Sequence, residues 1–253
     1  MANMAEYCKT NCTGVSTCIT RGWEFIEDEE GTRMYKRPYY VAKKCRLLKQ
    51  ADTATYVIAN AGEKYIGEDF NTYEVDADNQ KGFELCKSYA SALNMATKTG
   101  ILLVGPHGTG KTHLAVSILK AAFKRGIPAA QVFVPELIEE LKNEMKTNSE
   151  KISNKVKQTR FLVMDDIAAE TDTDWVKERL LILIEYRVRH ELPTVFTANC
   201  SGSELKERLG ERILSRMGGM CAYAAVKGRD RRKERRELAQ QALEMFGGRE
   251  VTN

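Results

Sequence analysis

A short apolar run, followed by a glycine-rich loop and a helix-forming stretch, constrains this chain more than any other feature. Residues Ile101 to Val104 are apolar, as in a buried strand of a parallel sheet. They lead into Gly105-x4-Gly110-Lys111-Thr112, and a helix-forming run extends from His113 to Arg125. This strand–loop–helix order is the context in which the pattern binds phosphate, because glycines let several backbone N–H groups point at one anion. The alternative is a chance glycine-rich turn.

Several groups of the loop would bind a nucleotide together. Backbone N–H groups and the positive end of the helix would face the phosphates. Lys111 would place a charge beside the β- and γ-phosphates, and the Thr112 hydroxyl would bind Mg²⁺. The predicted nucleotide-binding residues are Gly105, Pro106, His107, Gly108, Thr109, Gly110, Lys111 and Thr112.

Apolar stretches typical of strands alternate with helix-forming stretches from residue 100 onward. The expected strands are 100–104, 130–134, 161–164, 194–197 and 222–226. The expected helices are 79–96, 111–125, 136–146, 175–189 and 202–216, and the polar stretch 146–158 suits a surface loop or a short helix. This alternation predicts an α/β fold in which helices cover both faces of a parallel sheet.

Polar residues follow two of the later strands. Asp165 and Asp166 end the apolar run that begins at Phe161, and we expect Asp165 to hold Mg²⁺ and Asp166 to orient or deprotonate a water. Asn199 follows the strand that begins near Thr194; it could contact that water or the γ-phosphate, or belong to a helix N-terminus.

Two arginines four residues apart follow on one predicted helical face. Arg212 and Arg216 are separated by one turn. Two such guanidinium groups are usually solvated. An arginine presented to the γ-phosphate of a neighbouring subunit would instead neutralise charge in the transition state.

The ordered set of motifs resembles the AAA+ ATPases, and more narrowly the DnaC/DnaI-type replicative helicase loaders and their IstB-type transposition relatives. Matching segments are Gly105–Thr112 with His113-Leu-Ala, Leu162-Val-Met-Asp-Asp-Ile167, Thr197-Ala-Asn199, Arg212-Ile-Leu-Ser-Arg216 and Gly228-Arg-Asp-Arg-Arg232. Upstream, Phe70-Asn-Thr-Tyr73 and Cys86-Lys-Ser-Tyr89 resemble the lead-in to that family's core.

The resemblance implies an AAA+ three-layer fold without a C-terminal lid, and an ATPase that uses ATP and Mg²⁺. It implies that Asp166 is the hydrolytic carboxylate, Asn199 is sensor 1, and Arg216 is the arginine finger in trans, with Arg212 the second candidate. His113 and Arg232 would join the nucleotide site, although Arg231 stands where the family usually has an aromatic residue. The implied partners are a hexameric replicative helicase, single-stranded DNA and further copies of the chain.

Four cysteines gather near the N-terminus, at Cys8, Cys12, Cys18 and Cys45. A Zn²⁺ ion would stabilise a segment too small for a good core, and some loaders carry such a module. Four reduced thiols are the alternative, since neither pair has CxxC spacing. Cys86, Cys200 and Cys221 are expected to be packed thiols. The expected organisation is a Cys-rich module at 1–48 that grips the helicase, a linker at 49–75, the ATPase core at 76–236 and a tail at 237–253.

The composition bears on the location of the protein and on its possible charged partners. The chain has 253 residues, 43% of them hydrophobic, and a net charge of +4. No apolar run approaches the roughly 20 residues of a membrane span, and the N-terminus lacks a signal-peptide pattern, so we expect a cytoplasmic protein. Two basic stretches are either solvated or phosphate contacts: the run 227–236, and Lys142, Lys146, Lys151, Lys155 and Lys157.

Three other functions fit parts of the pattern. A transposition helper ATPase of the IstB type would share the core and differ at the N-terminus. A second alternative is a P-loop kinase that phosphorylates a small molecule. The paired aspartates, Asn199 and the paired arginines argue against it. A zinc-bearing DNA-binding protein that uses ATP only to change shape would lack turnover.

Overall fold

The computed structural model describes residues 68–147, 151–169 and 173–233, residues 237, 240 and 241, and the backbone of 23–27 and 40–44. The two short N-terminal segments are β1 (Trp23–Glu27) and β2 (Tyr40–Lys44), which pair in antiparallel fashion. Within these described parts, no helix combines the length and the apolar character needed to cross a membrane.

Five parallel strands form the central sheet of the described region. They are β3 (Gly100–Val104), β4 (Ala129–Phe133), β5 (Phe161–Asp165), β6 (Thr194–Ala198) and β7 (Cys221–Ala225). Their order across the sheet is β4-β5-β6-β3-β7, and each neighbouring pair is parallel. The expected parallel sheet is therefore confirmed.

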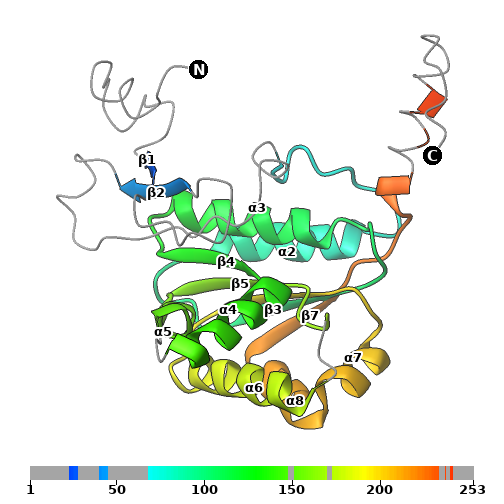
Figure 1. The fold of residues 1–253 in the computed structure, drawn as a ribbon. Coiled ribbons are helices and arrows are strands. Elements are labelled where there is room, and N and C mark those ends of the chain that lie inside the picture. The colour runs from blue at the N-terminus through cyan, green and yellow to red at the C-terminus, as the bar shows by residue number, and fades with distance from the viewer. Residues whose placement is uncertain are drawn as a thin grey trace.

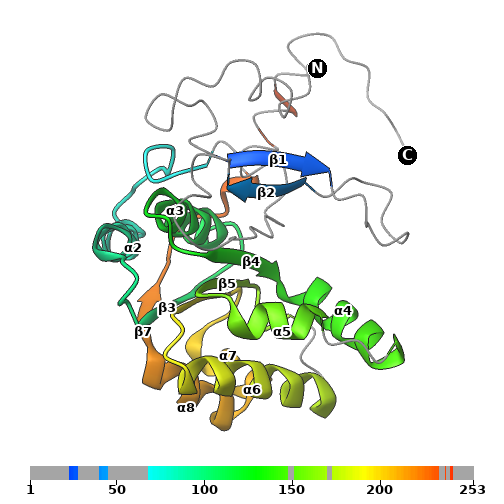
Figure 2. The same cartoon turned by 90° about the vertical axis from the view of Figure 1, so that its left-hand side faces the viewer.

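Helices cover both faces of this sheet (Figures 1 and 2). One face carries α2 (Gln80–Ala92) and α3 (Lys111–Lys124). The other carries α4 (Val134–Thr147), α5 (Lys151–Gln158), α6 (Asp174–Arg189), α7 (Gly202–Leu209) and α8 (Glu211–Met220). Successive strand residues face opposite sides, so Ile101 and Leu103 enter the core under α2 and α3 whereas Leu102 and Val104 enter the other.

Strand order decides which chain segments meet at the edge of the sheet. β6 lies between β3 and β5. Because all three strands run in the same direction, the loop after Val104, the carboxylate of Asp165 and the residues after Ala198 share one edge. Ligands of open α/β sheets bind at the carboxyl ends of the strands.

The helix expected at 202–216 is wrong, and the helix expected at 79–96 is shorter than predicted. The single helix expected at 202–216 is two helices, because Gly210 adopts φ +83° and ψ 159°, a backbone conformation that breaks a helix and that glycine adopts without steric cost. The helix expected at 79–96 ends at Ala92, since Leu93 turns to ψ 131°. Of the two alternatives for the polar stretch 146–158, a surface loop or a short helix, the structure shows the short helix α5.

Candidate nucleotide site

The loop between β3 and α3 curls under tight steric limits. Gly105 has φ +153°, and a Cβ there would lie 2.1 Å from the carbonyl oxygen of Val226. Gly110 has φ +91° at the start of α3, and a Cβ there would lie 2.6 Å from the ring of Tyr73. These two positions therefore require glycine, which explains two of the fixed residues in the sequence pattern.

Lys111 is buried against the loop that it belongs to. Its Nζ donates hydrogen bonds to the carbonyl oxygens of Gly105 at 2.9 Å and Pro106 at 2.6 Å. Burial lowers the pKa of Lys111 to about 8, although nearby Asp166 and Asp165 act in the opposite direction. The ammonium group thus lies inside the loop that the sequence predicts to bind phosphate.

Thr112, Asp165 and Thr197 form a hydrogen-bonded chain across three segments. The Thr112 hydroxyl donates to Asp165 Oδ1 at 3.0 Å, and the Thr197 hydroxyl donates to the same oxygen at 2.6 Å. Burial raises the pKa of Asp165, and the hydrogen bonds from Thr197 and Thr112 oppose that rise. A hydroxyl and a carboxylate held together in this way are oxygen donors of the kind that Mg²⁺ binds.

Asp166 and Asn199 occupy the expected edge of the sheet. Asp166 has φ +58°, which aspartate tolerates better than most residues, and its N–H donates to the Thr197 hydroxyl at 2.9 Å. Asn199 follows β6 and lines the same pocket as Lys111 and Thr112. Thr197 is a site residue that sequence reasoning did not select, although it stands in the quoted Thr197-Ala-Asn199 motif.

The lead-in segment before α2 packs against the loop. The Tyr73 hydroxyl donates to the carbonyl oxygen of Thr109 at 3.0 Å, and the His113 ring lies edge-on against the Tyr73 ring. His113 Nε2 lies 2.8 Å from the carbonyl oxygen of Asp69. The expected site residues Thr109 and His113 therefore contact the lead-in, and Tyr73 is a second residue that sequence reasoning missed.

The last motif, Gly228–Arg232, contributes two arginines to the lining of the pocket. The guanidinium of Arg231 lies 5.2 Å from the centre of the Tyr73 ring, and its two terminal nitrogens lie 3.1 Å from carboxylate oxygens of Glu74 and Asp76. Arg232 lines the pocket. Arg231, which occupies the family's aromatic position, thus binds the lead-in.

The pocket is lined by seven of the predicted nucleotide-site residues, and the others lie outside its lining. Its lining includes Gly108, Gly110, Lys111, Thr112, His113, Asn199 and Arg232, together with Glu68, Thr72, Tyr73, Glu74 and Arg231. Pro106 and His107 are exposed on the loop. Arg212 and Arg216 are exposed on α8 and do not line this pocket.

The cysteine predictions divide between two parts of the chain. Cys8, Cys12, Cys18 and Cys45 lie outside the described residues, so zinc binding there stays a prediction. Within the described segments, no group of three or more His, Cys, Asp or Glu side chains lies close enough to hold a metal ion. Cys86 and Cys200 are buried free thiols and Cys221 is a half-buried one, which confirms the expectation of packed thiols.

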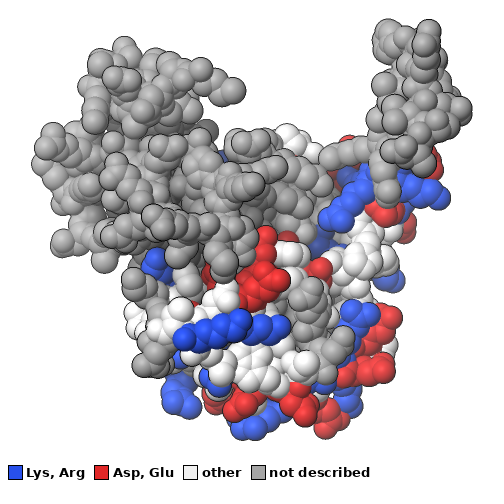
Figure 3. Space-filling model, viewed as in Figure 1, with Lys and Arg blue, Asp and Glu red and all other residues white. Residues whose placement is uncertain are grey.

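The basic side chains do not form one continuous surface on the face seen in Figure 3, where described acidic and basic residues are intermixed. Lys142, Lys146 and Lys155 are exposed on α4 and α5, and Lys157 is half-buried. The side chain of Lys151 lies outside the described residues. DNA contact by these lysines stays a prediction.

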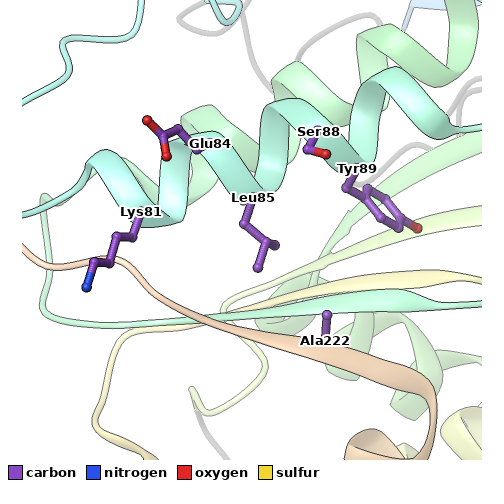
Figure 4. Close-up of a pocket in the computed structure, with 6 residues that line it drawn as sticks. All are labelled: Lys81, Glu84, Leu85, Ser88, Tyr89 and Ala222. Carbon is purple, nitrogen blue, oxygen red and sulfur yellow. The ribbon is translucent and has the colours of Figure 1, made fainter.

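A second pocket of about 520 Å³ lies between α2 and β7. Figure 4 shows Leu85 pointing from α2 toward the strand that carries Ala222, and Lys81, Glu84, Ser88 and Tyr89 complete the lining. This groove shares no residue with the nucleotide pocket and brings together no cluster of catalytic side chains.

Comparison with known proteins assigns the family. The model of IstB-like ATP binding proteins matches residues 53–239, which is most of the chain. The chain belongs to this family. The expected family and AAA+ fold class are thereby confirmed for the described core.

Relatives of this IstB-like chain include bacterial replication proteins. The replicative helicase loader DnaI of Bacillus subtilis is 34% identical over 148 residues, 53% of this chain and 47% of that protein. The loader DnaC of Escherichia coli K12 is 25% identical over 58% of this chain and 62% of DnaC. A crystal structure of the DnaC helicase loader aligns with TM-score 0.61 and 29% identity, covering 65% of this chain and 99% of that structure. The chain thus spans about half of the full-length DnaI and about three-fifths of the full-length DnaC.

Proposed function

We propose that this chain loads a replicative DNA helicase onto single-stranded DNA, and that ATP hydrolysis controls its release from the helicase. The observation that carries the enzymatic part is the Thr112–Asp165–Thr197 hydrogen-bonded chain beside buried Lys111. The helicase part is supported by relatives named as helicase loaders in two bacteria.

The side chains of the site divide the hydrolytic work. ATP supplies the bond that is hydrolysed, and Mg²⁺ would be held by Thr112 and Asp165. Lys111, which donates to two loop carbonyls, would turn to the β- and γ-phosphates. Asp166 would accept a proton from the attacking water, and Asn199 would orient that water.

A neighbouring copy would complete the site. Arg212 and Arg216 are exposed on α8, and one of them would contact the nucleotide of another chain. An arginine finger supplied in trans stabilises charge on the transferring phosphoryl group and raises the hydrolytic rate by roughly 10³ to 10⁵. Self-association through the nucleotide site is therefore part of the proposal.

The N-terminal residues 1–48 are proposed to bind the helicase, with residues 49–75 as the connection to the core. Exposed lysines on α4 and α5 are proposed to contact DNA phosphates. A transposition helper is the second candidate, because the matching family model describes IstB-like proteins. It would bind a transposase rather than a helicase.

A binding experiment separates these functions. The full chain is mixed with replicative helicases, or with IS21-type transposase, in the presence and absence of ATP, and retained complexes are measured. We expect ATP-dependent retention of a helicase. Lys111→Ala should abolish nucleotide binding or turnover. Retention of the transposase alone would refute the proposed role as a helicase loader. Full ATPase activity in Lys111→Ala would refute the assignment of the nucleotide site.

A further inference from the structure

Arg216 is joined to a carboxylate on a neighbouring helix. Its Nε lies 2.6 Å from Oε2 of Glu185 on α6. The Arg216 side chain is 46% exposed and that of Glu185 33% exposed, so the pair lies at the surface where α8 packs on α6. Within the described segments, no such ion pair engages Arg212 one turn earlier.

The atoms of this pair leave the end of Arg216 available. A guanidinium carries five N–H groups, and its two terminal nitrogens form the fork that grips phosphate oxygens. The ion pair uses Nε, and the described residues offer no hydrogen bond to either terminal nitrogen. Glu185 therefore contacts the guanidinium of this half-exposed side chain at Nε, and no hydrogen bond within the described residues occupies the two terminal nitrogens.

We propose that Glu185 is a positioning residue that holds Arg216 ready for the γ-phosphate bound by a neighbouring copy. This inference rests on the proposed function, since it assumes hydrolysis completed in trans. A free arginine samples many rotamers, and binding phosphate costs the conformational entropy of that freedom. A restraint on Nε makes this entropic cost smaller. The same restraint selects Arg216 over Arg212 as the finger.

Two other roles for the pair predict different behaviour. An ion pair that only stabilises the packing of α6 on α8 would affect every property of the fold. A pair that sequesters Arg216 would slow hydrolysis, so that its removal would accelerate turnover. A test must therefore examine Glu185 only in the copy that donates the finger.

Mixing two inactive variants provides this test. Lys111→Ala is the donor, which cannot use its own site but keeps Arg216. Arg216→Ala is the acceptor, which binds ATP but lacks the finger. Adding Glu185→Ala to the donor should lower the restored ATPase rate about tenfold, because a misplaced catalytic group loses most of its effect. The KM for ATP should not change, since the acceptor pocket is intact.

Three control variants test whether the effect depends on the charge of Glu185 and on its presence in the donor. Glu185→Gln in the donor should give an intermediate rate, because the amide keeps the size of the side chain but loses the charge that attracts Arg216. Glu185→Ala in the acceptor should leave the restored rate unchanged. Glu211→Ala in the donor breaks an exposed 2.5 Å ion pair between Glu211 on α8 and Lys206 on α7, and should also have no effect. Thermal unfolding checks that all variants are folded.

The outcomes separate this inference from the proposed function. Equal or faster hydrolysis with the Glu185→Ala donor overturns the positioning role, as does equal loss when the change is in the acceptor. If the wild type hydrolyses ATP but the Lys111→Ala donor restores nothing, hydrolysis in trans is wrong and the inference falls with it. Absence of turnover in the wild type refutes the proposed ATPase itself.

Discussion

The hydroxyl of Thr197, at the end of β6, donates a 2.6 Å hydrogen bond to Asp165 at the end of β5. The same hydroxyl accepts the N–H of Asp166 at 2.9 Å. One buried threonine thus holds both acidic residues of the site and links the two strands through side-chain hydrogen bonds at their carboxyl ends. Two predictions concern this site directly.

Replacing Thr197 with valine should impair hydrolysis more than ATP binding. Valine has the same shape but cannot donate to Asp165, so the pKa of Asp165 should rise further and the N–H of Asp166 loses its acceptor. The variant should lose about 1–3 kcal/mol of unfolding free energy and most of its ATPase rate. Urea unfolding and steady-state ATPase assays measure these effects, and Thr197→Ser should retain both properties. Wild-type turnover in Thr197→Val would contradict the assignment.

The affinity for ATP should be constant below about pH 8 and should fall at higher pH, because burial lowers the pKa of free Lys111 to about 8. Phosphates beside Nζ favour the charged form, so the bound protein keeps a proton that the free protein loses. Binding then takes up a proton above that pH, and affinity should decrease by up to about tenfold per pH unit. Calorimetric titration at several pH values measures this. Lys111→Arg, if it binds ATP, should show no such decline.

Arg187 should be essential for the position of α5. It is fully buried, and its guanidinium donates to the carbonyl oxygens of Val156, Lys157, Thr159 and Pro193 and to the Thr194 hydroxyl. Arg187→Met removes all of these donors and should cost about 3 kcal/mol of unfolding free energy, since each buried acceptor without a partner costs roughly 1–3 kcal/mol. Hydrogen exchange should accelerate in α5. The exposed Arg189→Gln on the same helix serves as control, and a similarly small loss in both variants would exclude this role.

Metal analysis tests the N-terminal module. If Cys8, Cys12, Cys18 and Cys45 bind Zn²⁺, the purified full chain should contain about one zinc per molecule. Changing all four cysteines to serine should remove that metal and weaken capture of the helicase, while leaving ATP binding by the core unchanged. A metal-free wild-type chain would exclude the zinc site.

Local sequence determined the elements with strong patterns. Ile101–Val104 and Phe161–Met164 were predictable as strands because continuous apolar runs bounded by polar residues suit a sheet covered on both faces. The loop Gly105–Thr112 was predictable because few residues other than glycine can occupy its positive-φ positions. The break at Gly210 was missed, since the apolar spacing on either side fits one continuous helix and a single glycine does not reveal its backbone angles.

The sequence by itself determined the parallel α/β class, the loop and the order of the acidic, asparagine and arginine motifs. Only the tertiary structure decided which distant residues meet. Strand order places β6 between β3 and β5, which brings Thr197 to Asp165, and helix packing brings Glu185 to Arg216. Neither pair has a signature in sequence, because a contact between residues about 30 apart depends on how complete elements pack rather than on local pattern.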